Sequence, residues 1–324
     1  GKPKGVPIYW GQLDAFVKAV LDAGTYDFRH TDRFLQMFEL TFDLSVFSYL
    51  VPLCVGASVY VLPEDGMVAL GVYDMLEEQQ ITVALMVPSV LGHLAKYLDE
   101  IELPHLRWSL FCGEALPHAA AAQWATAAPK ARIENVYGPT EATIFCTRYP
   151  FAAKQSALEQ MHGTVPIGKA LPGMALCVVD EAGRILPEGQ EGELCLMGPQ
   201  VTTGYWENPE KTAASFITVD YKGKPTAAYR TGDLARVNPH GNYIFLGRND
   251  NQVKIEGYRV ELGEIEHHVR DYLDQALCAV VPVANAAGQY TLHLFVEDKP
   301  GLDVHQLFQH LTKHLPTYML PRET

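Results

Sequence analysis

Segments that look helical alternate with short apolar runs over the first half of the chain. The helices are expected at 72–80, 90–99 and 117–128. The apolar runs, which are typical of buried strands, lie at 81–87, 108–112 and 133–137. Alternation of this kind predicts a mostly parallel sheet with helices on its faces. In such sheets ligands bind at the carboxyl ends of the strands.

The stretch Leu44–Leu62 contains no charged residue and is long enough to suggest a membrane span. Pro52 and Gly56 interrupt it, and acidic rather than basic residues flank it. We therefore expect a buried helix as far as Val55, a stop at Gly56 and then a strand over 58–62. The sequence predicts no membrane insertion.

The pattern changes from about Thr164 onward. Two strand-like runs, 174–180 and 193–198, are joined through glycine-rich turns, which predicts an antiparallel β subdomain. A third pattern starts near Asp250, where a short strand precedes a helix, two strands and a further helix. These helices are expected at 262–272 and 304–315, and the strands at 276–282 and 290–296.

The three patterns together predict an α/β fold with two domains. We expect a large domain over residues 1–247, which combines the mostly parallel sheet with the antiparallel subdomain, and a small α+β domain over 248–324. The chain has 324 residues, of which 48% are hydrophobic. That is enough to bury both cores without a disulfide or a structural metal.

Charge and cysteine content narrow the classes of partner and compartment. The net charge of −13 argues against a nucleic-acid binder, which normally presents a basic face. The six cysteines include no CxxC pair and no Cys/His cluster with metal-ligand spacing. Most lie in apolar runs such as Leu53-Cys54-Val55, where cysteine is usually buried. We expect a protein of the reducing cytoplasm.

Two segments carry the side chains that a nucleotide site needs. Asn135–Glu141 follows a predicted strand and offers an amide, an aromatic ring, a hydroxyl and a carboxylate. These groups could stack on a base, bond a phosphate and bind Mg²⁺. In Tyr229–Leu234, the Asp233 carboxylate follows a turn and could accept both ribose hydroxyls. Taken alone, the first segment could equally be an ordinary turn and the second a solvated loop.

Two further segments are rich in glycine and charge. Gly1–Val6 has the composition of a phosphate-contacting loop, but no Ser or Thr follows a Gly-Lys pair as a Walker A motif requires. Alone it favours a solvated basic terminus. Gly247–Glu266 lies at the expected domain boundary, and by itself it could be a polar linker that leads into an amphipathic helix.

These four segments, together with Phe42-Asp43-Leu44-Ser45, resemble motifs of the adenylate-forming superfamily in their residues and in their order along the chain. The resemblance is to the amino-acid adenylation domains of nonribosomal peptide synthetases and to D-alanine–carrier protein ligases. It implies that ATP and Mg²⁺ are used to form an aminoacyl adenylate. The aminoacyl group would then pass to a phosphopantetheine thiol on a carrier protein or carrier domain. Such enzymes work by positioning and by neutralising phosphate charge.

The resemblance also implies roles residue by residue. Thr140 would contact phosphate and Glu141 would ligate Mg²⁺, both as catalytic groups. Nucleotide contacts are further implied for Lys4 in the phosphate loop, for Gly113, Asn135, Tyr137 and Phe245 around the adenine, and for Asp233 and Arg248 at the ribose. Tyr137 and Phe245 would sandwich the base. In the small domain, Asp250 would be a hinge and Lys254 a catalytic group in the thiolation pose.

The same resemblance implies that Asp43 pairs with the α-ammonium group of an amino-acid substrate. The implied side-chain pocket is uncharged throughout and consists of Leu44, Phe47, Leu85, Leu110, Cys112, Val136, Ile144 and Phe145. A charged substrate side chain would be buried there without a partner. A small or apolar amino acid is therefore expected, with alanine of either hand a leading candidate and leucine, valine and proline open.

The printed sequence departs from the family pattern at both ends. An N-terminal subdomain before Gly1 and a Gly-Lys motif after Leu315–Pro321 are missing from it. We therefore expect a fragment that is poorly active by itself, because the missing lysine would contact the transition state. Two alternatives stay open: an acyl- or aryl-CoA synthetase, which Asp43 argues against, and a carrier-docking piece that kept the fold and lost activity.

Overall fold

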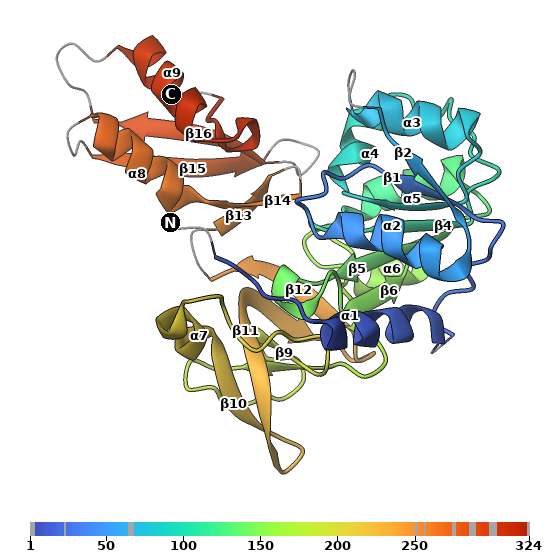
Figure 1. Ribbon diagram of the computed structural model, residues 1–324, viewed down its shortest axis with the longest axis horizontal. Helices are drawn as coiled ribbons and strands as arrows, with labels where there is room; N and C mark the ends of the chain where they lie inside the picture. The colour runs from blue at the N-terminus through green and yellow to red at the C-terminus, as the bar shows by residue number, and fades with distance from the viewer. Residues whose placement is uncertain are drawn as a thin grey trace. The chain divides into compact units, whose positions relative to one another are not determined.

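The computed structural model describes residues 4–22, 24–63, 68–249, 252–255, 257–273, 277–284, 290–297 and 303–322. They form two compact units, a larger one over Lys4–Asn249 and a smaller one over the described residues from 252 onward (Figure 1). Each unit is treated by itself below.

A seven-stranded sheet forms the centre of the larger unit's first part, in the order β2-β1-β3-β4-β5-β6-β7. Its strands are β1 (Arg33–Gln36), β2 (Ser58–Val61), β3 (Val83–Met86), β4 (Trp108–Phe111), β5 (Arg132–Tyr137), β6 (Thr147–Pro150) and β7 (Lys169–Ala170). Neighbours from β2 to β5 pair in parallel, whereas β6 runs antiparallel to both β5 and β7. The prediction of a mostly parallel sheet is confirmed.

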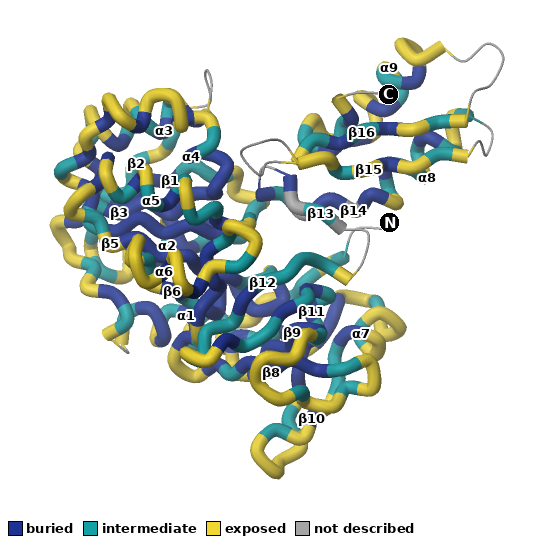
Figure 2. Tube along the Cα trace, turned by 180° about the vertical axis from the view of Figure 1, so that it is seen from behind, coloured by how far each residue is buried: buried dark blue, intermediate teal, exposed yellow. Residues whose placement is uncertain are grey.

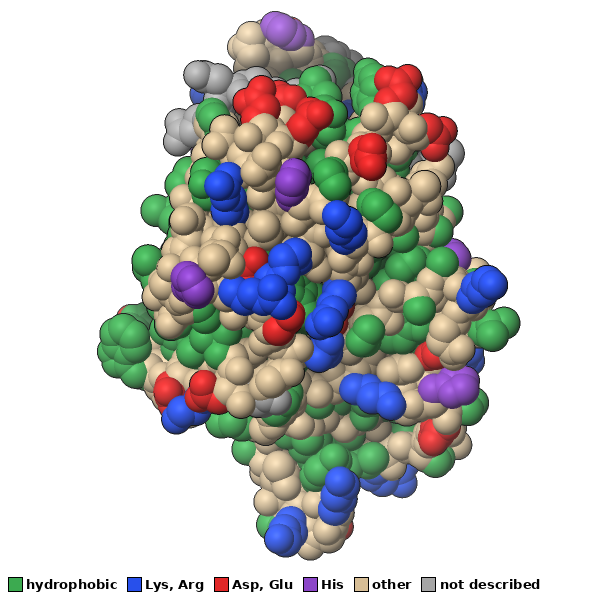
Figure 3. Space-filling view, turned by 90° about the vertical axis from the view of Figure 1, so that its right-hand side faces the viewer, with side chains coloured by type: hydrophobic (Ala, Val, Ile, Leu, Met, Phe, Trp, Pro, Cys, Tyr) green, Lys and Arg blue, Asp and Glu red, His purple; other side chains and the backbone are tan. Residues whose placement is uncertain are grey.

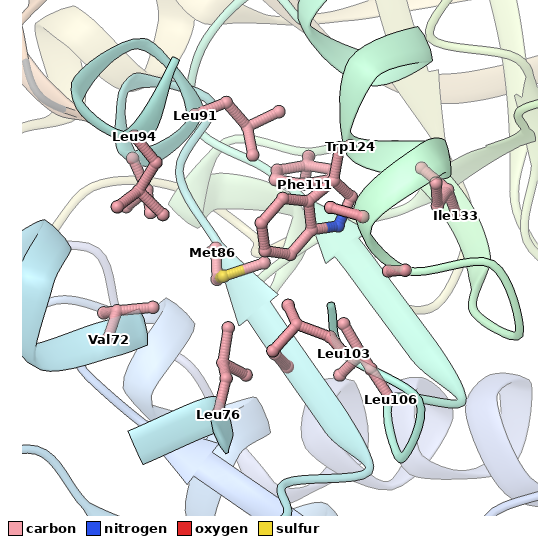
Figure 4. Packing of buried hydrophobic residues seen from close by; sticks show 14 of the residues in the cluster. Val72, Leu76, Met86, Leu91, Leu94, Leu103, Leu106, Phe111, Trp124 and Ile133 are labelled. Atoms are coloured by element: carbon pink, nitrogen blue, oxygen red, sulfur yellow. The ribbon is translucent and has the colours of Figure 1, made fainter. Parts of the chain in front are cut away.

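Helices cover both faces of this sheet. On one face α3 (Val68–Glu78), α4 (Ser89–Leu94) and α5 (His118–Ala127) bury a cluster that includes Leu76, Leu94 and Trp124 (Figure 4). On the other, α1 (Trp10–Val17), its π-helical continuation Lys18–Asp22 and α2 (Leu44–Val55) bury a second cluster around Phe16 and Phe47. A further helix, α6 (Ala153–Glu159), follows β6. Because both faces are covered, β3 and β4 are buried at every position, which explains their continuous apolar runs (Figure 2).

The uncharged stretch 44–62 forms the expected helix and strand, α2 and β2. Gly56 ends α2 with a left-handed φ of 71°, a conformation that glycine adopts without steric cost. In the part of the chain that the structure describes, no helix combines the length and the hydrophobicity needed to cross a bilayer. Two expectations nearby were wrong: Cys54 is exposed, because it lies on the outer face of α2, and α4 ends at Leu94 rather than near residue 99.

The second part of the larger unit is an antiparallel sheet in the order β10-β11-β9-β8, with β12 paired to β11. Its elements are β8 (Ala175–Val179), β9 (Gly192–Met197), α7 (Pro209–Ser215), β10 (Phe216–Tyr221), β11 (Lys224–Val237) and β12 (Tyr243–Arg248). The antiparallel pairing of β8 with β9 confirms the predicted subdomain. A hydrophobic cluster joins this sheet to the end of β5 through Tyr137 and Cys146.

The smaller unit is α+β, as expected. Its elements are the hairpin β13 (Gln252–Ile255) and β14 (Tyr258–Glu261), then α8 (Leu262–Tyr272), β15 (Cys278–Ala284), β16 (Tyr290–Val296), α9 (Val304–His314) and a 3₁₀ turn at Thr317–Met319. Both helices pack on one face of the β15–β16 pair, burying Val269, Leu294 and Leu311 among others. The Asp303 side chain caps α9 by accepting a hydrogen bond from the Gln306 backbone NH at 3.1 Å.

Candidate active site

Strand β5 ends where the two sheets of the larger unit meet. Asn135 and Tyr137 share one face of this strand, since alternate side chains point the same way. The Asn135 side-chain nitrogen donates to the carbonyl oxygens of Val165 at 3.2 Å and Pro166 at 3.0 Å. With its NH₂ group held in this way, the amide directs its oxygen, an acceptor, to the opposite side.

Asp233 on β11 joins the two sheets through a buried carboxylate that is 3% exposed. Its Oδ2 accepts a hydrogen bond from the Tyr137 hydroxyl, and its Oδ1 accepts one from Arg248 Nη1 at 2.6 Å. Arg248 lies directly opposite on β12. Burial, and then the charge of Asp233, raise the pKa of Tyr137 well above its ordinary value, so its hydroxyl remains a donor. A carboxylate has further lone pairs, so Asp233 can still accept hydrogen bonds from a ligand.

Glu141 lies in a 3₁₀ turn, η2 (Thr140–Ala142), that follows β5. Its side chain is 2% exposed, and Oε1 accepts a hydrogen bond from the Tyr205 hydroxyl at 2.6 Å. The hydroxyls of Tyr205 and Tyr229 lie 3.2 Å apart, and Lys4 Nζ is 5.6 Å from the centre of the Tyr205 ring. Thr140, next to Glu141, is exposed. A fixed carboxylate, an exposed hydroxyl and a lysine thus occur within one small region.

The donor set around Glu141 fits a hydrated metal ion. Among the described residues, no group of three or more His, Cys, Asp or Glu side chains is arranged to hold a metal. Mg²⁺ does not need such a group, since it keeps several waters and is bound through one or two carboxylates together with substrate phosphates. Glu141 can supply the carboxylate.

The loop after η2 is tightly folded. A Cβ atom at Gly138 would lie 2.4 Å from the Cα of Phe145 and 2.9 Å from the backbone nitrogen of Cys146, so only glycine fits there. Thr143 and Ile144 have φ values of 58° and 74°. Two consecutive β-branched residues in the left-handed region are strained, and such strain persists only where the surroundings impose it.

All eight residues of the predicted side-chain pocket belong to one buried cluster between the sheet, α1 and α2, and each is at most 2% exposed. They are Leu44, Phe47, Leu85, Leu110, Cys112, Val136, Ile144 and Phe145. The Phe145 ring centre lies 5.1 Å from that of Phe16 and 5.6 Å from that of Phe47. Asp43 immediately precedes α2, so it lies at the end of the helix that contributes Leu44 and Phe47. The packing leaves little room for a substrate side chain.

The remaining predicted site residues are identified by their positions in the fold. Gly113 follows β4 with a φ of 95°, and Phe245 on β12 is half-buried against the cluster that contains Tyr137. Tyr137 itself is 6% exposed. Lys254 lies on β13 in the smaller unit, opposite Arg259, and Asp250 lies outside the described residues.

Two residues of this region went unrecognised in the sequence. Tyr205 holds Glu141 from 64 residues away, and Gln200 bonds the carbonyl groups of the loop after η2. A glycine before Tyr205 was the available signal: Gly204 has a φ of 154°, and a Cβ there would lie 2.6 Å from the Thr212 side chain. Glycine alone does not reveal which distant carboxylate the next side chain contacts.

Positive and negative side chains are interspersed on the face of the molecule seen in Figure 3. Ion pairs of the larger unit show the same mixing, since Asp27 lies 3.1 Å from both Arg29 and Arg107 and 3.6 Å from Arg132. These pairs lie on exposed or half-buried groups and add little to stability.

Comparisons with known proteins connect this geometry to a family. A family model described as AMP-binding enzyme matches residues 1–206. The chain is 33% identical over 335 residues to the D-alanine–D-alanyl carrier protein ligase of Bacillus cereus, covering 100% of this chain and 64% of the ligase. It is 33% identical over 332 residues to tyrocidine synthase 3 of Brevibacillus parabrevis, covering 99% of this chain and 5% of the synthase.

Solved structures show the same likeness. The Vibrio cholerae adenylation domain AlmE, in complex with glycyl-adenosine-5'-phosphate, superposes with a TM-score of 0.88 at 33% identity, covering 99% of this chain and 60% of AlmE. The chain therefore spans less than two thirds of the length of these ligases and of AlmE.

Proposed function

Because this chain belongs to the family of AMP-binding enzymes, we propose that its gene product activates a small, uncharged amino acid as an aminoacyl adenylate. The observation that carries the proposal is the Asp233–Tyr137–Arg248 group, which lies beside the carboxyl end of β5 in the same unit as Glu141. Ligands of open α/β sheets bind at this end of the strands.

The nucleotide half of the site is argued from its hydrogen-bonding groups. Asp233 would accept the ribose hydroxyls, with Arg248 holding its carboxylate in place. The Asn135 oxygen would accept from the exocyclic amine of adenine, because both of its amide hydrogens are turned to backbone carbonyls. Gly113 would allow the base to approach the backbone closely, and Tyr137 and Phe245 would flank it. Lys4 and Thr140 would contact phosphate.

The chemical step needs no covalent help from the protein. A carboxylate oxygen of the amino acid bonds to the α-phosphorus of ATP while the bond to the bridging oxygen breaks, and pyrophosphate leaves. Mg²⁺ at Glu141 would neutralise the charge of the phosphates when bound. The side chains of this chain contribute position, because Tyr205 holds the Glu141 carboxylate and Asp233 fixes the nucleoside.

The amino-acid half of the site favours a substrate with little or no side chain. Eight packed, uncharged residues make up the predicted pocket, and Asp43, which immediately precedes α2, would pair with the α-ammonium group. Two relatives support the same size class: the Bacillus ligase is named for D-alanine, and AlmE was solved with a glycyl adenylate. We expect glycine or alanine to be preferred.

A second step, transfer of the aminoacyl group to a carrier, would follow. The thiol of a phosphopantetheine on a carrier protein would attack the adenylate carbonyl, form a thioester and release AMP. The Bacillus ligase is named for such a carrier protein. Asp250 would be the hinge for this step, and Lys254 on β13 would take part in it.

ATP–pyrophosphate exchange across the twenty amino acids tests the proposal. The assay uses the full-length gene product, with any sequence encoded on either side of residues 1–324. We expect exchange with glycine or alanine, and its loss in Glu141→Gln. Preference for aspartate or lysine would exclude the proposed pocket. Exchange with fatty or aryl acids would favour a CoA synthetase, and nucleotide binding without any exchange would favour a carrier-docking protein.

A further inference from the structure

The loop that carries Ile144 and Phe145 is held by a glutamine from a distant segment. Gln200, which follows β9, is 0% exposed. Its Nε2 lies 3.0 Å from the carbonyl oxygen of Phe145, 3.3 Å from that of Ala142 and 3.4 Å from that of Thr143. The Thr143 hydroxyl in turn donates to the backbone carbonyl oxygen of Gln200 at 2.7 Å.

These bonds coincide with the strained part of the loop. Thr143 and Ile144 have positive φ values. The carbonyl groups of Ala142 and Phe145, on either side of them, both accept from the Gln200 side-chain amide. The Gln200 Oε1 atom is buried without a hydrogen-bond partner among the described residues. Burying Oε1 without a partner costs free energy, which is offset by the bonds that the same amide donates to the loop carbonyls.

Glu141 has separate anchors. Its carbonyl oxygen accepts from the Thr202 backbone NH at 2.8 Å, and its side chain accepts from Tyr205. The segment 200–205 thus holds the loop at two places, with Tyr205 at the carboxylate and Gln200 at the backbone of the pocket residues.

We infer that Gln200 is a positioning residue that imposes the strained backbone of Thr143–Phe145 and thereby fixes the shape of the substrate side-chain pocket. This inference rests on the proposed function, because it takes the pocket around Ile144 and Phe145 to be the amino-acid site. Gln200 acts through the loop and contacts neither substrate.

The test replaces Gln200 with methionine, which keeps the shape and removes the donor. In ATP–pyrophosphate exchange with the full-length gene product, we expect the KM for the amino acid to rise about tenfold, the effect of losing one hydrogen bond. The KM for ATP should change by less than about threefold, because Glu141 keeps its own anchors. Thermal stability should fall moderately, because the buried carbonyl oxygens of Ala142, Thr143 and Phe145 lose their donor.

Two control variants make the result specific. Tyr205→Phe should show the converse, a larger rise in the KM for ATP than in that for the amino acid. Asn238→Ala removes a side chain that holds a distant turn through bonds to Glu159 and to the backbone of residues 240 and 242. It should lower stability without separating the two KM values. If Gln200→Met leaves both KM values within twofold, or lowers stability and raises both equally, Gln200 has no positioning role.

A readout independent of activity separates this inference from the proposed function. Hydrogen exchange of the Thr143 and Cys146 amides, which are bonded to Thr140 and Tyr137, should be faster in Gln200→Met. If the wild-type protein exchanges pyrophosphate with no amino acid, the proposed function fails, and this measurement still decides whether Gln200 holds the loop. Unchanged protection of both amides overturns the inference. Gln200→Asn, which shortens the reach of the amide, serves the same test if the methionine variant does not fold.

Discussion

Truncation of Phe145 to alanine should enlarge the substrate pocket at a measurable cost in stability. Phe145 is 0% exposed, and its ring meets that of Phe16 edge-on at 5.1 Å. Removing a buried phenylalanine side chain costs about 3–5 kcal/mol. For a unit of this size each kcal/mol lowers the melting temperature by about 2–4 °C. We therefore expect a folded variant that melts about 6–20 °C lower.

The expected gain in activity toward larger amino acids can be calculated for the same Phe145→Ala variant. A leucine substrate has three more side-chain carbons than alanine, and burying each contributes about 0.8 kcal/mol. If the new cavity accommodates them, kcat/KM for leucine relative to alanine should rise about fiftyfold. Pyrophosphate exchange with glycine, alanine, valine and leucine measures this ratio for the wild type and the variant.

The control is Leu76→Ala, on α3, in the cluster on the opposite face of the sheet (Figure 4). It should lower the melting temperature by a similar amount and leave the ranking of amino acids unchanged. The reasoning is refuted if the wild-type protein already uses leucine as well as alanine. It is also refuted if folded Phe145→Ala keeps the wild-type ranking within threefold.

Three further predictions concern the nucleotide site, the loop and the smaller unit. Asp233→Asn leaves the guanidinium of Arg248, which is 9% exposed, without its carboxylate partner. We expect the variant to lose about 3–5 kcal/mol of stability and to bind ATP more weakly, as measured by calorimetry. An unchanged affinity for ATP would contradict the role assigned to Asp233. Gly138→Ala forces the backbone at Phe145 to move, because the new Cβ would lie 2.4 Å from the Cα of Phe145. Pyrophosphate exchange should therefore fall at least tenfold. Near-wild-type exchange would show that the loop can shift without loss of activity. Burial, and then the charges of His314 and His268, lower the pKa of His310; the unfolded chain therefore binds more protons, and the smaller unit should lose stability as the pH falls below about 6.5. Hydrogen exchange of α9 at pH 7.5 and 5.5 measures this loss, which His310→Gln should reduce; equal protection at both pH values would contradict it.

Strands with continuous apolar runs and helices with a helical apolar period, such as α8 and α9, could be predicted from the sequence, whereas strands of mixed composition could not. Strand β16 occupies the expected residues, and α2 ends at the expected glycine. Strand β1 was missed because Arg33 and Gln36 bracket just two apolar residues, although both of those are buried between neighbouring strands. Strand β11 was missed because its burial alternates and a glycine interrupts it, so it gives no long apolar run.

The site residues could also be predicted only in part. Asp233, Tyr137, Arg248 and Glu141 could be proposed because their segments resemble family motifs, but the bonds between them could not be predicted and Tyr205 was missed. The bond between Glu141 and Tyr205 spans 64 residues, and that between Tyr137 and Asp233 spans 96. Periodicity reports which face of one element is buried, whereas these contacts depend on how two sheets meet.

The meeting of the two sheets has a physical reason that links stability to catalysis. A parallel sheet presents its strand ends to ligands, but an ionised carboxylate at that edge needs partners if it is to be buried. The antiparallel part supplies Tyr205 for Glu141 and Gln200 for the loop that follows, and it also carries Asp233 on β11 with Arg248 opposite on β12. Arg248 is placed by the pairing of β12 with β11, whereas Gln200 and Tyr205 lie in the segment between β9 and α7. Substitutions in the antiparallel part should therefore alter nucleotide and amino-acid binding separately, according to which partner is lost.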